Sequence, residues 1–411
     1  MEEKNPTPVW KHPQIFETTD QEVSTPKQPN TYDKKTIFKH VALFLITFAM
    51  VSLAGASFVG FNPTLFPIAL PGIEDFWRGA LFAGLLLGFL ATHEFGHFFA
   101  AIHHKIKVSL PYFIPIPLGI GTMGAVIRIR QKIHNSRKMF DVGAAGPLAG
   151  FVVSIAVLLI GFATLPDPSY INQFAGHEAV KEFVNNYGYF PEMPPGESTG
   201  QTLIVGETLL YTLLAGFFEN VPPMWEMYHY PFLFAGWLGL FFTALNLMPV
   251  GQLDGGHILY SLIGFEKQKL VARIAFGLLT ILAGIEFIPF VHIFLGEWSH
   301  PTGFYSLVIW AGILFLLLRK GYHNEHTWIA PVLVISLISS AAYLFFQVDS
   351  LGSANSSLIW IVWCFFIAYF VGIEHPPVLN EEKLDPTRRF LGWLCMIIFV
   401  LCISPNPLYF I

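Results

Sequence analysis

Two histidines and one glutamate stand at a spacing that suits a metal-dependent hydrolase. Residues 91–98 read Ala-Thr-His-Glu-Phe-Gly-His-Phe. On a helix, His93 and His97 lie one turn apart on the same face, so both imidazoles can bind a single zinc ion. Glu94 lies beside them and could accept a proton from a water molecule that attacks the substrate. This stretch therefore predicts a catalytic metal site.

The surroundings of this short motif argue against a chance occurrence. A chain with 15 histidines could contain the pattern by accident. The motif lies, however, in a hydrophobic run over residues 77–102 that is long enough to cross a bilayer. Ionisable side chains are costly in hydrocarbon unless they have partners, so they mark functional sites there by default. We therefore expect the zinc site to lie inside a membrane.

The composition is that of a chain that crosses a membrane many times. Of the 411 residues, 54% are hydrophobic and only 12% are charged. Soluble domains carry about twice that share of charged residues, which excludes a soluble enzyme. The net charge of −5 is uninformative, since the distribution of charge matters more in a membrane protein. Cys364, Cys395 and Cys402 lack metal-ligand spacing and are expected to be small buried side chains.

Nine hydrophobic segments are candidates for membrane-spanning helices, and the short late ones leave this number open by one or two. The predicted fold is therefore an all-α polytopic membrane protein with about nine transmembrane helices. The predicted spans cover residues 38–60, 77–102, 141–165, 232–250, 270–295, 303–318, 328–347, 357–373 and 390–408.

Three parts can be distinguished along the chain. Residues 1–35 are polar and rich in proline, and we expect them to form a flexible cytoplasmic tail. They have no apolar core of signal-peptide length, and their lack of arginine argues against an organelle transit peptide. Residues 36–265 are expected to form a membrane-embedded core that contains the metal site. Residues 266–411 are expected to add transmembrane helices without site residues.

The charges of the loops predict how the chain is threaded. Residues 103–140 contain seven Lys or Arg and no Asp or Glu, whereas residues 166–231 contain eight acids and one base. The positive-inside rule places the first loop and the N-terminus in the cytoplasm and the second loop outside. His93 then lies toward the cytoplasmic end of its helix. Within the outer loop, residues 202–218 are apolar around Glu207 and are expected to form a helix on the outer surface.

Residues 108–130 are expected to form a hairpin, because prolines and glycines interrupt any helix there. Non-helical backbone at membrane depth is tolerated only where protein covers it or water reaches it. We therefore expect a small membrane-associated β-hairpin near the active site, with an ordinary cytoplasmic hairpin as the alternative. From residue 122 the sequence alternates as a strand does. One face would carry Met123, Ala125, Ile127 and Ile129, and the other Gly124, Val126, Arg128 and Arg130.

A third metal ligand must come from elsewhere, because a hydrolytic zinc site uses three protein ligands and one open position. Asp254 is the best candidate, at the end of an apolar span and at the depth predicted for His93. It lies in residues 244–257, which read Ala-Leu-Asn-Leu-Met-Pro-Val-Gly-Gln-Leu-Asp-Gly-Gly-His. Pro249 and the glycines would loosen the helix. A carboxylate so close to hydrocarbon needs a partner, and zinc would be one.

These two segments together resemble the site-2 protease family of intramembrane zinc metalloproteases. That family combines His-Glu-x-x-His on one helix with Asn-x-x-Pro-x-x-x-x-Asp-Gly on another. Asn246, Pro249, Asp254 and Gly255 match the second pattern position by position. Two motifs in the expected order are far more specific than either motif alone.

A third segment adds to the resemblance. Residues 143–150, Gly-Ala-Ala-Gly-Pro-Leu-Ala-Gly, look like the family's segment of small residues, which would let the metal-bearing helices approach closely. The resemblance covers about residues 77–263 and includes no PDZ-like insert. It therefore points to a branch of the family without a PDZ domain, and it implies that residues 36–265 form an intramembrane metalloprotease core.

The resemblance implies a role for each site residue. His93, His97 and Asp254 would bind one zinc ion per chain. Glu94 would act as general base and then as general acid, and Asn246 would steady the substrate carbonyl or the oxyanion. The strand would hold an unwound substrate by pairing with its backbone. Its substrate-binding residues would be Thr122, Met123, Gly124, Ala125, Val126, Ile127 and Arg128.

Several polar residues near these segments receive no role in the chemistry. His257 could orient Asp254, but a histidine satisfied at a helix end is at least as good an interpretation. The others are expected at the membrane interface, near the outer end of a span, or in a rigid cytoplasmic turn. They are His103, His104, Glu286, His292 and residues 374–377.

The predicted function is hydrolysis of peptide bonds in or next to transmembrane helices of membrane-protein substrates. The expected partners are that substrate and the lipid bilayer, and not nucleic acid, while the oligomeric state stays open. The expected location is a bacterial inner membrane, with no organelle excluded. A catalytically silent scaffold of the same fold is one alternative, but no motif residue is lost. A metal or proton transporter is the other, but it would show repeats and ionisable residues in several spans.

Overall fold

The structure is a computed structural model that describes residues 32–58, 72–117, 119–174, 176–195, 203–296, 302–346 and 358–410. Most of the predicted tail, residues 1–35, lies outside the described residues. The described part is mostly helical, as the composition predicts, and its strands form two small antiparallel pairs.

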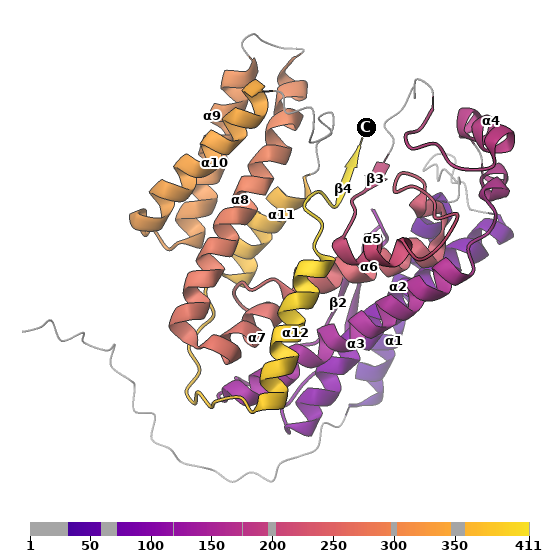
Figure 1. Cartoon of the computed structure of the whole chain (residues 1–411). Coiled ribbons are helices and arrows are strands. Elements are labelled where there is room, and N and C mark those ends of the chain that lie inside the picture. The colour runs from indigo at the N-terminus through magenta and orange to yellow at the C-terminus, as the bar shows by residue number, and fades with distance from the viewer. Residues whose placement is uncertain are drawn as a thin grey trace, which may run out of the picture.

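Five helices from the first two thirds of the chain form the core around the motif residues. They are α1 Lys34–Phe58, α2 Ile73–His103, α3 Ser136–Ala163, α6 Pro231–Leu247 and α7 Asp254–Ile263. α1 packs on α2, α2 on α3, and α3 on both α6 and α7. Figure 1 shows α1, α2 and α3 side by side at the lower right. Large buried side chains such as Phe89, Phe234 and Trp237 fill the space between these helices.

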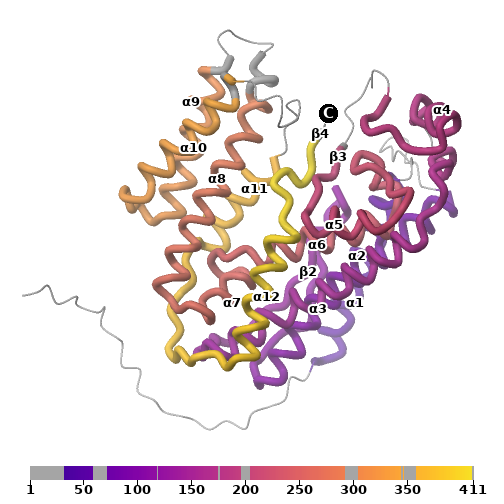
Figure 2. Tube along the Cα trace, in the orientation of Figure 1, coloured from indigo at the N-terminus to yellow at the C-terminus, as the bar shows by residue number. Residues whose placement is uncertain are grey.

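The last third of the chain adds a second group of helices. It comprises α8 Phe265–Gly296, α9 Thr302–Gly321, α10 His326–Phe346, α11 Ile359–Phe366 with its π-helical continuation Ile367–Val371, and α12 Pro386–Cys402. α8 packs against α9, α10 and α11, at the left in Figures 1 and 2. α12 instead returns to pack along α6 and α7. The end of the chain thus contacts the helices that carry the motifs.

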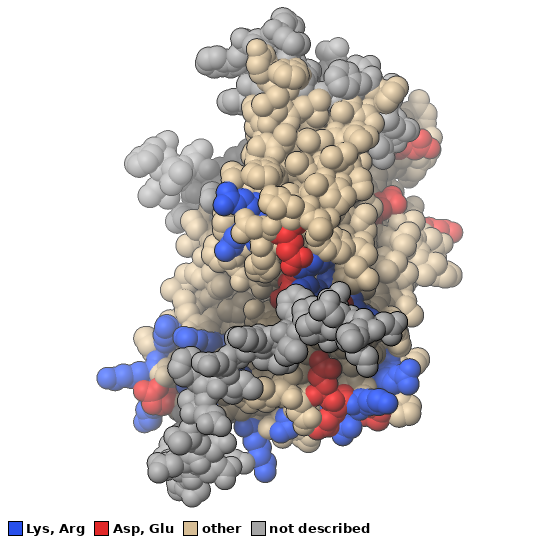
Figure 3. Space-filling view, turned by 90° about the vertical axis from the view of Figure 1, so that its left-hand side faces the viewer, with Lys and Arg blue, Asp and Glu red and all other residues tan. Residues whose placement is uncertain are grey.

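Six helices in the described part of the chain are long and apolar enough to cross a membrane. They are Lys34–Phe58, Ile73–His103, Ser136–Ala163, Phe265–Val291, Phe304–Gly321 and His326–Tyr343. The other three predicted spans also fall on helices, namely α6, Ile359–Val371 and α12, but these have at most 17 residues. The number of nine spans is therefore not confirmed. In Figure 3, a broad surface without charged side chains lies above a lower end where many Lys and Arg gather.

α6 is shorter than the predicted span because the chain leaves the helix at Met248. The following residues are apolar, but protein covers them: Met248 is 3% and Val250 0% exposed. Pro249 ends the helix, because proline disfavours the helical conformation in the residue before it. Hydropathy alone does not distinguish residues buried by protein from residues buried by lipid.

The predicted hairpin is present. β1 Tyr112–Pro115 pairs antiparallel with β2 Thr122–Val126, with an irregularity between Phe113 and Pro115. The strict alternation of faces was wrong, because Met123 is 68% exposed while Ala125 is buried. Gly124 explains the difference, since its φ of +99° interrupts the regular strand. Backbone pairing nevertheless continues past β2, as Val108 bridges Ile129.

The predicted outer loop folds into a small unit of short elements. They are η1 Pro168–Gln173, α4 Glu178–Tyr187, β3 Leu203–Val205, α5 Leu209–Ala215 and η2 Met227–His229, and β3 pairs with β4 Leu408–Phe410. A small apolar core lies among them, with Phe174, Val184 and Trp225 buried. The continuous helix predicted for residues 202–218 was wrong, because the strand β3 takes up its first part.

Candidate active site

α2 carries both histidines of the first motif into the interior of the core. His93 is 3%, Glu94 7% and His97 6% exposed. The two imidazoles lie on one face of the helix, as their spacing predicts, and their Nε2 atoms are 3.0 Å apart. Both rings therefore present a nitrogen to the same point.

Asp254 completes the group from a distant part of the chain. It is the first residue of α7, and its Oδ2 lies 3.4 Å from His93 Nε2 and 3.2 Å from His97 Nε2. Zinc bonds of about 2.1 Å at tetrahedral angles place ligand atoms about 3.4 Å apart. The three donor atoms thus have the separation and the chemical type that a zinc ion requires.

The surrounding groups leave one nitrogen of each imidazole available to a metal. His97 Nδ1 lies 2.6 Å from the carbonyl oxygen of Val142. A carbonyl only accepts hydrogen bonds, so Nδ1 carries the proton and Nε2 presents its lone pair. His93 Nδ1 is buried and has no hydrogen-bond partner among the described residues. The interactions of His93 thus concentrate on Nε2, the atom that faces Asp254.

Small residues on α3 make room for the two histidines. A Cβ atom at Gly146 would lie 2.1 Å from His97 Nε2, and one at Gly150 would lie 3.3 Å from the Cβ of His93. On the other side, a Cβ atom at Gly96 would meet the carbonyl oxygen of Ala145 at 2.6 Å. The segment 143–150 therefore allows α2 and α3 to approach closely.

The turn between α6 and α7 brings Asn246 and Asp254 to the same place. Asn246 Nδ2 lies 3.4 Å from His93 Nε2. The turn is tight, since Cβ atoms at Gly255 and Gly256 would lie 1.9 Å and 2.2 Å from backbone oxygens. Glycine is therefore required after Asp254, which explains why the motif continues with it.

Glu94 is placed beside the metal ligands without being one of them. Its Oε1 lies 4.0 Å from His93 Nε2. A cavity of about 290 Å³ opens in front of it, lined by the three metal-ligand candidates, Asn246 and the hairpin residues Ala125, Val126, Ile127 and Ile129. A substrate carbonyl in this cavity would reach both Glu94 and the metal position.

The hairpin turns one edge of its second strand toward this cavity. Arg128 and Arg130 donate backbone hydrogen bonds to Ser109 Oγ and to the carbonyl oxygen of Lys107, on the β1 side. Because backbone groups alternate along a strand, the N–H groups of Ile127 and Ile129 point the opposite way. The backbone of Ile127 accordingly faces the Glu94 carboxyl group. In the described part of the chain, no strand pairs with this edge.

Residues 372–385 join α11 and its π-helical continuation to α12 and are called the strap below. The strap contributes His375, to which the sequence analysis gave no role. His257 Nδ1 lies 2.7 Å from Nε2 of His375, in the segment that joins α11 to α12. Burial lowers the pKa of His257 to about 4 and also lowers the pKa of His375. Both rings are therefore neutral at pH 7, and one donates to the other. His257 is thus bonded to His375, and no hydrogen bond joins it to Asp254 in the described structure.

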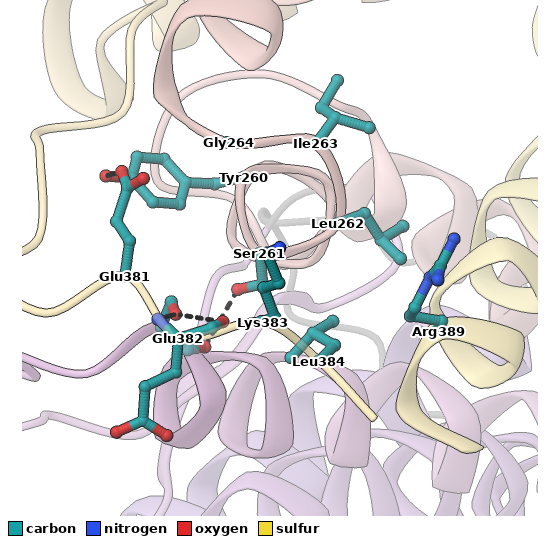
Figure 4. A pocket seen from close by; sticks show the side chains of 11 residues that line it. Tyr260, Ser261, Leu262, Ile263, Gly264, Glu381, Glu382, Lys383, Leu384 and Arg389 are labelled. Atoms are coloured by element: carbon teal, nitrogen blue, oxygen red, sulfur yellow. Dashed lines mark hydrogen bonds between the residues drawn. The ribbon is translucent and has the colours of Figure 1, made fainter. Parts of the chain in front are cut away.

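The same strap is attached to α3 and α7 at several points. Gly251 donates its backbone N–H to the carbonyl oxygen of Ile373 at 2.8 Å. Farther along, Ser136 Oγ accepts a hydrogen bond from the backbone N–H of Glu382, and the Tyr260 hydroxyl contacts the Glu381 carboxylate. Figure 4 shows the end of α7 and the strap residues from Glu381 on facing each other across a polar cavity of about 550 Å³. The strap therefore supports the helix that begins with Asp254.

The other polar residues considered from the sequence lie outside the metal site. His104 Nε2 pairs with Asp141 at 2.8 Å, and Arg388 of α12 binds the same carboxylate through Nε and Nη2. His103 belongs to the last turn of α2, beyond the two ligands. Glu286 lies in α8, and the side chain of His292 lies outside the described residues.

Comparisons with known proteins identify the family of the segment that carries these residues. Residues 81–283 match the family model of Peptidase family M50, the family of the site-2 proteases. This segment contains both motifs and the helix between them. No solved structure matches the chain significantly.

Three curated plant proteins illustrate the similarity. "Probable zinc metalloprotease EGY1, chloroplastic" of Arabidopsis thaliana is 32% identical over 224 residues, which are 54% of this chain and 35% of that protein. "Probable zinc metalloprotease EGY2, chloroplastic" of Oryza sativa subsp. indica is 29% identical over 51% of this chain and 34% of its own length. For "Probable zinc metallopeptidase EGY3, chloroplastic" of Arabidopsis thaliana, the identity is 26% and the shares are 56% and 37%.

The matched region spans only about a third of the length of each of these relatives. The family match, which covers residues 81–283, includes the parts of the helices that carry the donor atoms. These helices bring two histidines and one aspartate to a common point. The chain therefore belongs to the site-2 protease family of zinc metalloproteases.

Proposed function

We propose that this protein is an intramembrane zinc endopeptidase that cuts peptide bonds in or next to transmembrane helices of membrane-protein substrates. One observation carries the proposal. Three donor atoms lie within 3.4 Å of one another at a cavity that is also lined by a strand edge left unpaired in the described part of the chain. The first feature is what zinc requires, and the second is what an unwound peptide requires.

The metal would be one zinc ion held by His93, His97 and Asp254. Zinc at this site would supply a Lewis acid that makes water nucleophilic near neutral pH. Glu94 would accept the proton of that water and return it to the leaving amine, since its carboxylate is near the metal position but not bound to it. Asn246 would donate a hydrogen bond to the substrate carbonyl oxygen as negative charge develops there.

The hairpin would hold the substrate during these steps. A transmembrane helix is a poor substrate, because its carbonyl groups are already hydrogen-bonded. Once unwound, its backbone would pair with the N–H and C=O groups of Ile127 and Ile129, which replaces the bonds that the helix has lost. The substrate-binding residues predicted from Thr122 to Arg128 would thus bind the substrate through their backbone. Of these residues, Ala125, Val126 and Ile127 line the cavity.

A second cavity would provide a path for the rest of the substrate. It measures about 560 Å³ and shares five lining residues with the active-site cavity, namely Ile129, Ile133, Met139, Gln252 and His257. Arg130 and Lys132 line its other part. We expect a segment that passes the metal position to continue into this space, on the side predicted to face the cytoplasm.

The protein would be a multi-pass membrane protein with its N-terminus in the cytoplasm. For the chain to have nine spans, three short helices must also cross the membrane, namely α6, Ile359–Val371 and α12. They would cross where the bilayer is locally thin or where neighbouring helices surround them. A bacterial inner membrane was the expected location, but the relatives are named as chloroplastic and do not support it. The absence of a PDZ-like insert remains a proposal from the sequence.

The experiment is cleavage of a reporter membrane protein in vesicles that contain the purified full chain. Wild-type protein should cut the reporter within or beside its transmembrane helix, and a chelator should stop the reaction. A scaffold would bind the reporter without cutting it. A transporter would instead move metal ions or protons across the vesicle membrane, which an enclosed fluorescent indicator would detect.

A further inference from the structure

The small unit of short elements that the predicted outer loop forms is called the outer unit below. A second group of metal-ligand side chains lies in it, away from the active site. His177, Glu226 and His229 each offer one ligand atom, and these three atoms lie within 4.8 Å of one another. His229 precedes α6 by two residues, whereas Asn246 lies near the other end of that helix. A helix of this length separates the two sites by about 25 Å. The two groups are therefore independent.

Glu226 is the central member of this group, and one of its oxygens lacks a partner. Its side chain is 0% exposed. Oε1 lies 2.6 Å from His229 Nδ1, but Oε2 has no hydrogen-bond partner within the described ranges. His177 Nδ1 lies 3.9 Å from Oε2, which is too long for a hydrogen bond. A buried carboxylate oxygen without a partner is costly, and a cation would remove this cost.

The two imidazoles are held in position from several sides. The ring of Phe174 stacks on His229 with centroids 4.2 Å apart and planes 8° apart. The ring of His177 meets His229 edge-on at 5.0 Å. His177 adopts a φ of +60°, a strained conformation for a residue other than glycine. The packing thus orients both rings toward the carboxylate of Glu226.

We propose that His177, Glu226 and His229 form a second zinc site, which joins α4 to the start of α6. Two imidazoles and a carboxylate are ligands that zinc accepts, and they leave one position open to water. Binding requires ligand atoms that now lie up to 4.8 Å apart to move to about 3.4 Å from one another, a change of up to about 1.4 Å. His177 is the most exposed member, with 24% of its side chain accessible, so the ion would enter from its side.

Zinc at this site would stabilise the outer unit. This unit has a core of few apolar side chains and consists of short elements joined by loops. A small core of this kind gains much of its stability from a metal or a disulfide. No disulfide is available in the described part of the chain, where all three cysteines are free. Zinc would hold α4 against the segment that leads into α6.

The test counts zinc in the purified full chain. A His93→Ala/His97→Ala variant lacks the active-site ligands and should still hold one zinc ion per chain, measured by elemental analysis after dialysis against buffered zinc. Adding Glu226→Gln or His177→Ala should weaken this binding by about tenfold or more, since a ligand is lost. Glu226→Gln keeps the size of the side chain and an acceptor for His229, so it should fold.

Glu178→Gln provides the matched control. Glu178 follows His177 directly, but 82% of its side chain is exposed and it pairs with Lys181. It should leave the zinc content unchanged. Cobalt substituted for zinc should give a visible absorption spectrum that Glu226→Gln removes and Glu178→Gln retains.

Two results would overturn the proposal. The first is a His93→Ala/His97→Ala protein that is folded by circular dichroism but binds no zinc. The second is a Glu226→Gln protein that binds zinc as tightly as its parent. Failure of the active site to bind metal would instead appear as an unchanged zinc content between wild type and the His93→Ala/His97→Ala variant, so the two proposals can fail separately.

Discussion

The imidazole and carboxylate groups of the proposed zinc site have donor atoms that lie within 3.4 Å of one another. The carbonyl oxygen of Val142 lies 2.6 Å from His97 Nδ1 and fixes the tautomer of that ring. His93 lies one helical turn before His97, on the same face of α2. Asp254 lies beside them although it comes more than 150 positions later in the chain. A site arranged in this way should depend strongly on each donor, because the remaining two cannot move to compensate.

We predict that Asp254→Ala loses most of the zinc from the active site. Two histidines would remain, and the ion would then lack both a ligand and the negative charge that offsets its own. Zinc content and X-ray absorption of the purified variant provide the measurement. An unchanged coordination shell in this variant would show that Asp254 is not the third ligand.

Glu94→Gln should abolish cleavage while zinc stays bound. The substitution removes the proton acceptor but no ligand, and loss of general acid–base help costs about 10²–10⁴ in rate. A glutamate with two roles should lie at the upper end of this range. Turnover of a reporter substrate, measured alongside zinc content, separates the two effects. Near-normal turnover would contradict the assigned role.

At the scale of elements, two features place the site: the small-residue segment of α3 and the edge of β2. α3 allows close approach because glycine stands where a side chain would strike the histidines. The segment that continues β2 turns the N–H groups of Ile127 and Ile129 away from the β1 side, and both residues line the cavity. Each feature yields a test with a neighbouring control position.

Gly146→Ala should weaken zinc binding at the active site by about tenfold or more, since the new methyl group would lie 2.1 Å from His97 Nε2 and displace the ring. Gly88→Ala on α2 is the control, because a Cβ atom there meets nothing within 4 Å. Alanine is the better helix former, so Gly88→Ala should not lose stability. Zinc titration of both variants is the measurement. Equal affinities would show that the close packing of α3 does not matter to the metal.

Ile129→Pro should impair substrate capture without loss of zinc. Proline removes an N–H group that points toward the cavity, and one backbone hydrogen bond is worth about 0.5–1.5 kcal/mol. The value of kcat/KM should therefore fall about two- to tenfold, mainly through KM. Ile127→Pro should act in the same direction, with an added effect on kcat because its backbone faces Glu94.

Alanine at Ile127 and Ile129 keeps the N–H group and should do much less. Val126→Pro is a further contrast, since the alternation of the strand turns its N–H toward β1. This variant should lower the melting temperature by disturbing the hairpin. If folded Ile127→Pro and Ile129→Pro variants cleave a transmembrane reporter as fast as wild type, the strand does not hold the substrate through its backbone.

At the scale of the whole molecule, the C-terminal segment is tied to the catalytic core. α12 packs along α6 and α7, and the strap before it bonds to the turn that precedes Asp254. Arg388 joins three helices, since the Asp141 carboxylate that it binds also pairs with His104. These contacts give the last helices a supporting role at the site.

Arg388→Gln should therefore lower the free energy of unfolding by about 1–2 kcal/mol, a figure reduced for the partial exposure of this pair. Its zinc content should be unchanged. Arg389→Gln is the control, because Arg389 is an exposed neighbour that takes no part in the bond to Asp141. Thermal unfolding of both proteins in the same detergent is the measurement. Equal stability of the two variants would show that this junction contributes little.

Much of the site follows from the sequence because its signals are local. His93, Glu94 and His97 occur within one helical turn, so their common face follows from the geometry of a helix. Asp254 is recognisable because Asn246, Pro249 and Gly255 surround it at the family's spacing. The membrane environment follows from composition, since hydrophobic runs of this length require apolar surroundings.

Other features depend on contacts between residues that are far apart in the chain. The sequence predicts a strand at residues 122–130, but only its pairing with β1 decides which N–H groups face the cavity. His257 meets His375 across 118 positions, and His177 lies 3.9 Å from Glu226 although α4, β3 and α5 separate them in the chain. No periodicity links such residues. The packing of helices and loops brings them together, and this packing depends on the shapes of all the side chains at once.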